Sequence, residues 1–395
     1  MGGSLQRVQK AFAFQPPDRT PLFEIFQPYH PIHWPICGRN IATDAALAWD
    51  ALAEGVTSEE LVEAHAQAEF KVCKHFGLDM VRLNGVVPAS LPAGAEAGTT
   101  PKKLGPQRWE LDGIEHGVNP RTQMVEPVNP GQSAADSAKT DENALRKEIL
   151  EWDGNAHVKM GPDRFLNRVQ ELAAAEGLDW VFMGEIGCGT GVAFYPPCML
   201  MWLVDEPELI RRWIEMKKAR AFAITKNCIA NGCKVVAMGG DVSCDKGPFI
   251  SPAMYREFIL PAIQEHVKVI HDAGALAVYT SDGNHWPIKE DFFFNSGVDG
   301  YKEVDQAAGM TWPRLIKEGV YGRVCIIGNL DARHTLCHRT PDDVRREVIE
   351  CLKYGQTGSG GHILHASHSV HEDVKAENYI AAVGAYREYF GMGRI

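Results

Sequence analysis

The chain has 395 residues, of which 45% are hydrophobic and 23% are charged, the balance of a globular protein with a substantial core. Its formal net charge of −11 argues against general binding to nucleic acid and against docking on an anionic membrane surface, because both are themselves negatively charged. No apolar segment approaches the roughly 20 residues that a membrane-spanning helix needs.

The first residues and the cysteines predict a cytoplasmic protein. The segment from Met1 to Arg7 lacks the long apolar core of a secretory signal. In the cytoplasm the ten cysteines are expected to stay reduced. No two of them form a Cys-x-x-Cys pair, so a zinc knuckle held by thiolates is not expected.

The N-terminal part is predicted to alternate between helices and short strands. A first helix is expected from Leu5 to Phe14, where the prolines that follow end it. An apolar run at residues 21–26 predicts a strand, and the amphipathic segments 45–53 and 58–76 predict two helices. Residues 79–84 predict a second strand that ends in polar side chains.

Residues 85–150 differ in composition from the rest of the chain. They are rich in Gly, Pro, Ala and Thr and contain two short strand-like runs, around Trp109 and Gln123. This pattern predicts an inserted, hairpin-like subdomain after the second strand, which could serve as a lid over one face of the protein.

From residue 160 onward helices and strands alternate without a break. Six further strands are predicted at 180–184, 234–238, 275–279, 297–301, 324–327 and in the histidine-rich segment from 360. Together with the two early strands this gives eight strands separated by helices. The pattern favours a single (β/α)8 TIM barrel of the α/β class over residues 1–395, rather than a doubly wound sheet.

Polar side chains follow almost every predicted strand. The carboxyl ends of parallel strands in a barrel meet at one face, which is the catalytic face of barrel enzymes. Any one of these residues could instead cap a helix or bond a loop, but their recurrence predicts a site. They are Glu24, Arg82, Asn84, Glu185, Asp241, Asp282, Glu303, Asp331 and His368.

The last predicted strand ends in three histidines, at positions 365, 368 and 371. Imidazole is neutral near pH 7, binds metals and transfers protons, so this grouping indicates a chemical site. The alternative is that one or two of these histidines only bond the backbone or face solvent.

Several segments resemble the uroporphyrinogen decarboxylase superfamily, which includes the decarboxylase and the cobalamin-linked methyltransferases. The segments are Pro17–Pro21, Gly240-Asp241, Phe249–Pro252, Gly283-Asn284, Gly328–Asp331 and Gly360–Ile363 before Glu377-Asn378. None alone is specific, but together they span nearly the whole chain. The resemblance implies a TIM barrel.

The decarboxylase itself is the less favoured branch. Its arginine-rich substrate segment is absent, since residues 27–34 here read Gln-Pro-Tyr-His-Pro-Ile-His-Trp. A porphyrinogen carries up to eight carboxylates and needs clustered Arg and Lys to hold them.

The methyltransferase branch resembles this chain more closely, with altered zinc ligands. Those enzymes hold zinc with a His-x-Cys pair after the fifth strand and a Cys after the eighth. The matching positions here carry Thr280, Asp282 and His368. Carboxylate and imidazole also bind zinc, so the resemblance implies a zinc site that includes Asp282 and His368.

A third zinc ligand must come from elsewhere. Glu303 is the first choice, with Asp241 and Glu185 in reserve. Outside the ligand set, Asp241 and Glu185 are predicted to act in catalysis, although Asp241 could also be a helix-capping acid. His365 is expected to support a ligand and His371 to lie at the periphery.

The expected substrate contacts come from polar and aromatic residues near strand ends: Glu24, Arg82, Asn84, Tyr195, Tyr279 and Trp286. Aromatic walls suit an aryl ether, but ordinary core packing is an alternative for each ring. Arg82 and Asn84 could bind a carboxylate or hydroxyl of the substrate, or Arg82 could form a structural ion pair with Asp79 or Glu24.

The resemblance and the altered ligands imply an O-demethylase type of methyltransferase. Oxygen and nitrogen ligands make zinc a stronger Lewis acid, which suits a methyl ether, most simply a methoxylated aromatic. The methyl acceptor would be the cobalt(I) of a corrinoid (cobalamin) on a separate protein, because no Asp-x-His-x-x-Gly signature is present. The alternatives are a decarboxylase-like lyase and a non-catalytic subunit that binds a corrinoid or tetrapyrrole. Homodimers are common among the relatives.

Overall fold

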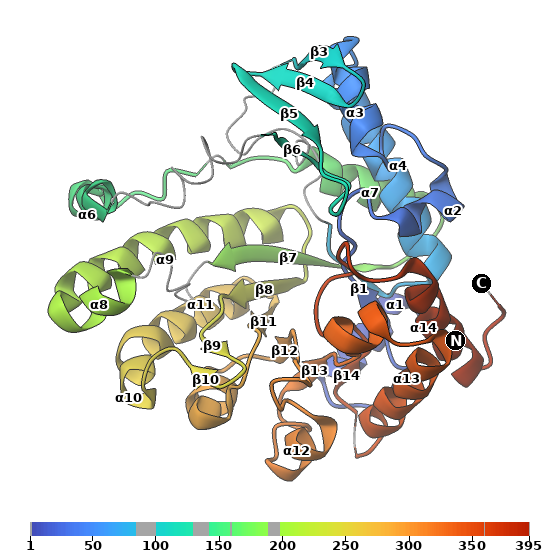
Figure 1. Ribbon diagram of the computed structural model, residues 1–395. Helices are drawn as coiled ribbons and strands as arrows, with labels where there is room; N and C mark the ends of the chain where they lie inside the picture. The colour runs from blue at the N-terminus through green and yellow to red at the C-terminus, as the bar shows by residue number, and fades with distance from the viewer. Residues whose placement is uncertain are drawn as a thin grey trace.

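Eight parallel strands form the central sheet of the computed structural model, which describes residues 2–83, 100–128, 142–158, 160–188, 198–358 and 360–394 (Figure 1). Their order in the sheet is the order of the chain. The strands are β1 (Phe23–Glu24), β2 (Met80–Val81), β7 (Val181–Cys188), β8 (Val235–Gly239), β11 (Leu276–Thr280), β12 (Gly300–Lys302), β13 (Cys325–Ile327) and β14 (His362–Ile363).

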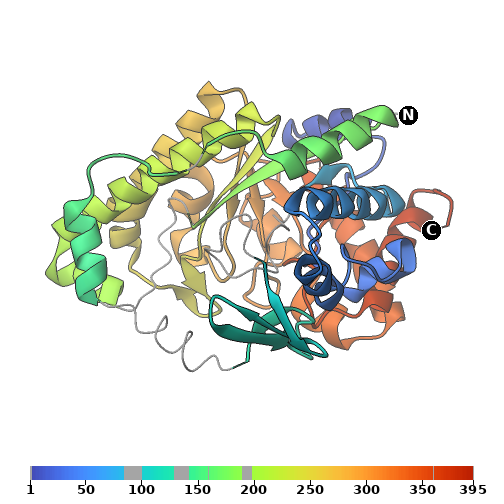
Figure 2. The same cartoon turned by 90° about the horizontal axis from the view of Figure 1, so that it is seen from above.

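The first and last strands join and close the sheet. Leu364 donates a backbone hydrogen bond of 2.9 Å to Pro21, and its carbonyl accepts one of 3.0 Å from Phe23. Figure 2 accordingly shows the N-terminal and C-terminal helices on the same side of the molecule. The predicted TIM barrel is confirmed.

Helices surround the strands (Figure 2). They are α1 (Ser4–Phe12), α2 (Trp34–Cys37), α3 (Ala45–Ala53), α4 (Ser58–Phe76), α6 (Glu142–Glu151), α7 (Arg164–Ala175), α8 (Cys198–Asp205), α9 (Pro207–Ala230), α10 (Pro252–Met254), α11 (Leu260–Asp272), α12 (Trp312–Lys317), α13 (Pro341–Gly355) and α14 (Ala376–Tyr389). Short 3-10 or π segments are η1 (Pro31–His33), η2 (Tyr255–Ile259), η3 (Trp286–Ile288), η4 (Glu290–Asn295) and η5 (Ala332–Leu336). Within the described ranges, no helix is both long and apolar enough to cross a membrane.

The interior of the barrel has an apolar lower layer and a polar upper layer. Alternate strand residues point inward, and those near the amino ends, such as Met80, Val235 and Ile363, form one buried apolar cluster. Helix α1 closes this end with Val8 and Phe12. The polar inward residues lie at the carboxyl ends, so the site is built there.

An antiparallel sheet follows β2 in the chain. Its strands are β3 (Lys102–Gly105), β4 (Arg108–Leu111), β5 (Ile114–Val118) and β6 (Val125–Pro127). It packs on α3, where the Trp109 indole donates a hydrogen bond of 3.0 Å to Asp50. This sheet lies within the predicted insertion, residues 85–150, which also contains most of α6. Residues 85–99 and 129–141 of the insertion lie outside the described ranges, and its role as a lid stays a prediction.

Candidate metal centre

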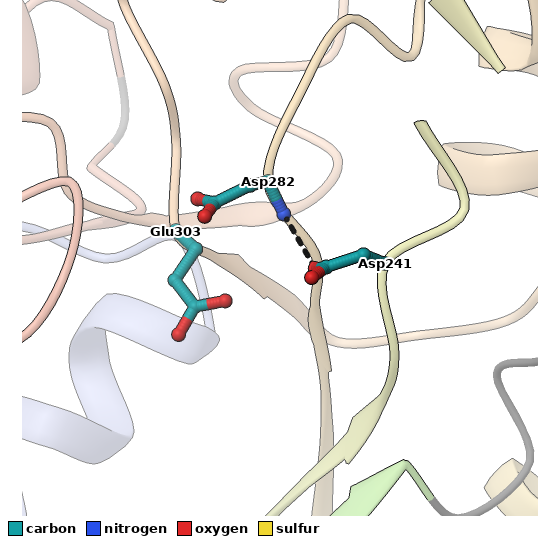
Figure 3. Close-up of side chains that lie close together, drawn as sticks. All are labelled: Asp241, Asp282 and Glu303. Carbon is teal, nitrogen blue, oxygen red and sulfur yellow. Dashed lines mark hydrogen bonds between the residues drawn. The ribbon is translucent and has the colours of Figure 1, made fainter. Parts of the chain in front are cut away.

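Three carboxylates meet at the carboxyl ends of three neighbouring strands (Figure 3). Asp241 lies two residues after β8, Asp282 two residues after β11, and Glu303 directly after β12. One oxygen from each lies within 4.8 Å of the others. Asp282 and Glu303, both predicted as zinc ligands, therefore come together with Asp241, which was predicted as a catalytic residue and reserve ligand.

The backbone around these carboxylates is tightly constrained. The Asp282 amide donates a hydrogen bond of 3.3 Å to Asp241, which links two of the three loops (Figure 3). Gly283 has φ +97°, and a Cβ there would lie 2.8 Å from the Ser243 carbonyl, so glycine is required for this close approach. Glu303 has φ +66°, a conformation unusual for a residue other than glycine and typical of functional sites.

The carboxylates carry more negative charge than the nearby cations balance. Burial, together with the charges of Glu303 and Asp241, raises the pKa of Asp282 to about 8. Burial and Glu303 also raise the pKa of Asp241, against the hydrogen bond from Asp282. A bound divalent cation would relieve this repulsion, and carboxylate oxygens are suitable ligands for it. The residues present therefore fit a metal ion.

His368 lies beside the cluster rather than within it. Its Nε2 is 3.9 Å from Asp282 Oδ2, too long for a hydrogen bond, and its side chain is half exposed. The sequence prediction grouped Asp282 and Glu303 with His368, whereas in the structure the third member of the group is Asp241. The reason is that β8, β11 and β12 are adjacent in the sheet, while β14 lies two strands beyond β12.

A buried lysine connects the cluster to a second ion pair. The Lys302 ammonium lies 2.8 Å from Glu303 Oε1 and 3.7 Å from Glu185 Oε2, and its side chain is fully buried. Burial opposes ionisation of Glu303, but Lys302 and, more weakly, His368 and His365 outweigh it and hold the pKa of Glu303 below its ordinary value. The sequence prediction missed Lys302, although its place on the inward face of β12 follows from strand alternation.

Arg82 pairs with Glu185, and not with Asp79 or Glu24, the two partners considered for it in the alternative of a structural ion pair. The Arg82 Nε lies 2.7 Å from Glu185 Oε2. Arg82 directly follows β2 and Glu185 lies on the adjacent strand β7, whereas Asp79 lies before β2, at the opposite end of the barrel. The role of Arg82 in substrate binding and that of Glu185 in catalysis remain predictions.

Two cavities of about 500 and 520 Å³ open on either side of Asp282. The first also reaches His368, and the second also reaches Asp241. Arg333 borders both and is held by Asp245 at 3.0 Å and Asp305 at 3.1 Å. The carboxylate cluster is therefore accessible to a small molecule.

The predicted aromatic wall has no support from the positions of Tyr279 and Trp286. Tyr279 is fully buried and packs on Phe292, because it follows the inward-facing Val278 and so points outward toward the helices. Trp286 is also buried, and its indole donates to the Gly309 carbonyl at 2.9 Å. The predicted substrate contacts Asn84 and Tyr195 lie outside the described residues.

The two other histidines have different surroundings. His365 is fully buried, with its Nδ1 2.9 Å from Glu24 Oε1. His371 borders the first cavity, where its Nε2 lies 3.9 Å from the Cys337 sulfur. Glu24, predicted to bind substrate, is therefore the neighbour of a histidine that was predicted to support a ligand.

Comparison with known proteins identifies the half of the chain that carries this site. Residues 196–389 match the family model of uroporphyrinogen decarboxylase (URO-D). This segment of the chain is therefore similar to the URO-D family. The matched segment includes all three carboxylates and His368, and the match agrees with the superfamily resemblance seen in the sequence.

Curated relatives are similar over a shorter stretch. The uroporphyrinogen decarboxylase of Chlorobium phaeobacteroides is 33% identical over 132 residues, which are 31% of this chain and 34% of that protein. That of Pseudoalteromonas translucida is 28% identical over 151 residues, 36% of this chain and 39% of that protein. The chain thus aligns with little more than a third of the length of these relatives.

A solved structure shares the fold over the whole length. A methyltransferase from Methanosarcina mazei superposes with a TM-score of 0.62 at 18% identity, covering 99% of this chain and 100% of that chain. The segment that matches the URO-D model and the strands before it therefore form one barrel, whose fold that structure shares.

Proposed function

We propose that this protein is a metal-dependent methyltransferase that moves a methyl group from a methyl ether to the cobalt(I) of a separate corrinoid protein. The observation that carries the proposal is the cluster of Asp241, Asp282 and Glu303, whose negative charge calls for a cation at the mouth of the barrel. The similarity of residues 196–389 to the URO-D family and the barrel shared with a methyltransferase support the class of reaction.

The three carboxylates would hold the metal, and His368 could complete its ligands after a small side-chain rotation. Zinc accepts both carboxylate and imidazole ligands. Bound there, zinc would supply a Lewis acid for the ether oxygen. Lys302 keeps Glu303 ionised, and Arg333 keeps the loops that carry Asp245 and Asp305 in place around the cavities.

The second candidate is a decarboxylase-like lyase, favoured by the similarity to uroporphyrinogen decarboxylases. The charges around the cavities speak against a polycarboxylate substrate. The two cavities are bordered by six acidic side chains: Asp241, Asp245, Asp282, Asp305, Glu372 and Asp373. The lysine and arginine side chains that border the same cavities number only three, namely Arg121, Lys246 and Arg333. A porphyrinogen would need the reverse balance.

A non-catalytic subunit that binds a corrinoid or tetrapyrrole is the third candidate. Such a subunit has no need for a cluster of three carboxylates in which the pKa values of Asp241 and Asp282 are raised. Metal content separates it from the methyltransferase.

The test combines metal analysis with an assay of methyl transfer. Purified protein is expected to contain one metal ion per chain, lost in Asp282→Asn and reduced in His368→Ala. With a reduced corrinoid protein and a panel of methoxylated aromatics and methylated amines, wild type should remove the cobalt(I) absorption band with one class of donor. The zinc part fails if wild type holds no stoichiometric metal and chelation leaves the rate unchanged. Decarboxylation of a porphyrinogen without methyl transfer would establish the second candidate.

A further inference from the structure

A buried glutamate–histidine pair lies where the barrel closes. Glu24 ends β1, and His365 lies two residues after β14, the strand that pairs with β1. The side chains of Glu24 and His365 are 2% and 0% exposed, and Glu24 Oε1 lies 2.9 Å from Nδ1 of the imidazole. The Ala366 amide donates to the other carboxylate oxygen at 3.3 Å, which fixes the carboxylate between the two strands.

His365 belongs to the upper, polar layer of the barrel interior. Ile363 is part of the inward apolar cluster, and His365 follows it by two residues, so both occupy the same face of the strand. The ring of Phe23, another inward residue, packs on the imidazole at 4.6 Å between centroids. Glu185 and Lys302 occupy the same layer on other strands, next to the carboxylate cluster.

The second nitrogen of this imidazole has no partner. Among the described residues, nothing forms a hydrogen bond with His365 Nε2, although the atom is buried. The contact of Nδ1 with Glu24 is close but out of line for a full hydrogen bond. Buried polar atoms are nearly always satisfied, and catalytic hydrogen bonds often tighten only when the substrate is bound. A ligand oxygen at Nε2 would satisfy this nitrogen.

We infer that His365 is a proton donor to the oxygen of the substrate and that Glu24 is the residue that positions it. This inference rests on the proposed methyl transfer. The cobalt(I) supplies an electron pair that forms the cobalt–carbon bond, and the carbon–oxygen bond of the ether breaks with its electrons on oxygen. The proton on His365 Nε2 moves to that oxygen, so the products are an alcohol or phenol, a methylated cobalt(III) and a neutral imidazole. Glu24 keeps the Nδ1 proton in place and stabilises the imidazolium before transfer.

The dependence of the rate on the leaving group tests this assignment. Aryl methyl ethers whose phenols range from strongly acidic (nitro-substituted) to weakly acidic (alkoxy-substituted) differ in how much the departing oxygen needs a proton. Wild type should show a shallow dependence on phenol acidity. His365→Asn should lose about 100-fold or more with weakly acidic phenols, the usual contribution of a general acid, and at most about threefold with nitro-substituted ones. Glu24→Gln should change the dependence in the same direction, and Glu24→Asp should partly restore it.

The chain offers a matched control. His271 lies 2.8 Å from Asp299, a second histidine–carboxylate pair, but Asp299 directly precedes β12 at the opposite end of the barrel. His271→Asn should leave the leaving-group dependence as in wild type. Metal content and thermal melting of every variant show whether the site is still assembled.

A second readout does not depend on any variant being folded. The solvent deuterium isotope effect on wild-type methyl transfer should be larger with weakly acidic than with strongly acidic phenols. Equal isotope effects, or an equal loss in His365→Asn across all ethers, would overturn the proton-donor role while leaving the methyltransferase proposal intact. Absence of methyl transfer by wild type with every ether would overturn both.

Discussion

Replacing Asp282 by asparagine should stabilise the metal-free protein while abolishing its response to metal. The raised pKa of Asp282, about 8 against an ordinary 3.8, means that folding without metal favours the neutral carboxyl. This difference sets a ceiling of about 6 kcal/mol on the cost of keeping the group ionised. Because the side chain is 36% exposed and solvent screens it, we expect a net cost of about 1–2 kcal/mol.

The sign of the pH dependence follows from the same shift. Since the folded-state pKa is raised, the folded protein binds more protons than the unfolded chain between about pH 4 and pH 8. The free energy of unfolding of the metal-free wild type should therefore fall as the pH rises through this window. Asparagine carries no charge, so its advantage over wild type should be near zero at about pH 4 and complete above about pH 8.

Thermal and urea unfolding of wild type and Asp282→Asn, each with chelator and with zinc, provide the assay. Zinc at about 100 times its dissociation constant should stabilise wild type by about 2.7 kcal/mol and the variant by much less, so their order reverses. Asp245→Asn is the matched control, because Arg333 holds the pKa of Asp245 below its ordinary value and its removal offers no gain. A metal-free Asp282→Asn that is less stable than wild type at pH 8 would refute the reasoning.

Two further substitutions test the support of the site. Lys302→Met should destabilise the protein by about 3–5 kcal/mol in urea unfolding, because it leaves Glu303 without its buried cation, and adding Glu303→Gln should recover part of the loss. If the double variant is no more stable than the single one, Lys302 acts by packing alone. Gly283→Ala should cost at least about 1–2 kcal/mol for its left-handed backbone and more for its close contact, and should lower metal content. Gly319→Ala, with φ +70° and open space around it, should cost the backbone part only and leave metal content unchanged.

The parts of the fold that local signals specify were predictable from the sequence. The helices predicted at 45–53 and 58–76 have those bounds in the structure, and the second begins with a capping box between Thr57 and Glu60 and ends at Gly77 with φ +75°. The first helix ends at Phe12, two residues before its predicted end. Eight strands separated by helices were enough to predict the barrel, because parallel strands with helical connections have few other arrangements.

The partners within the site were less predictable, because they depend on contacts between distant segments. The sequence places Asp241, Asp282 and His368 after strands, but only the packing of the loops decides which two join Glu303. The phase of a strand is a similar case. Tyr279 points outward because Val278 points inward. If the alternation is predicted wrongly by one residue, a side chain that packs in the core is taken for one that lines a cavity. Buried charges such as Lys302 are missed because an apolar segment predicts burial without showing its ionic partners.

The two ends of the barrel differ in how well their buried charges are balanced. This difference explains how the fold can accommodate the repulsion between the carboxylates of the site. At the amino end the charges are balanced, since the fully buried Asp79 pairs with both Arg7 and Arg19 over the apolar layer that α1 seals. At the carboxyl end Asp282 has a raised pKa and Glu303 an unusual φ, and His365 has a buried nitrogen without a described partner. Each of these features costs stability in the protein alone, and a cation or a substrate oxygen would relieve the carboxylate repulsion and satisfy the buried nitrogen. Because the buried charges at the amino end are paired, the barrel can remain folded despite the unfavourable free energy of these features. Selection for binding rather than for stability is therefore the simplest explanation of the carboxyl end.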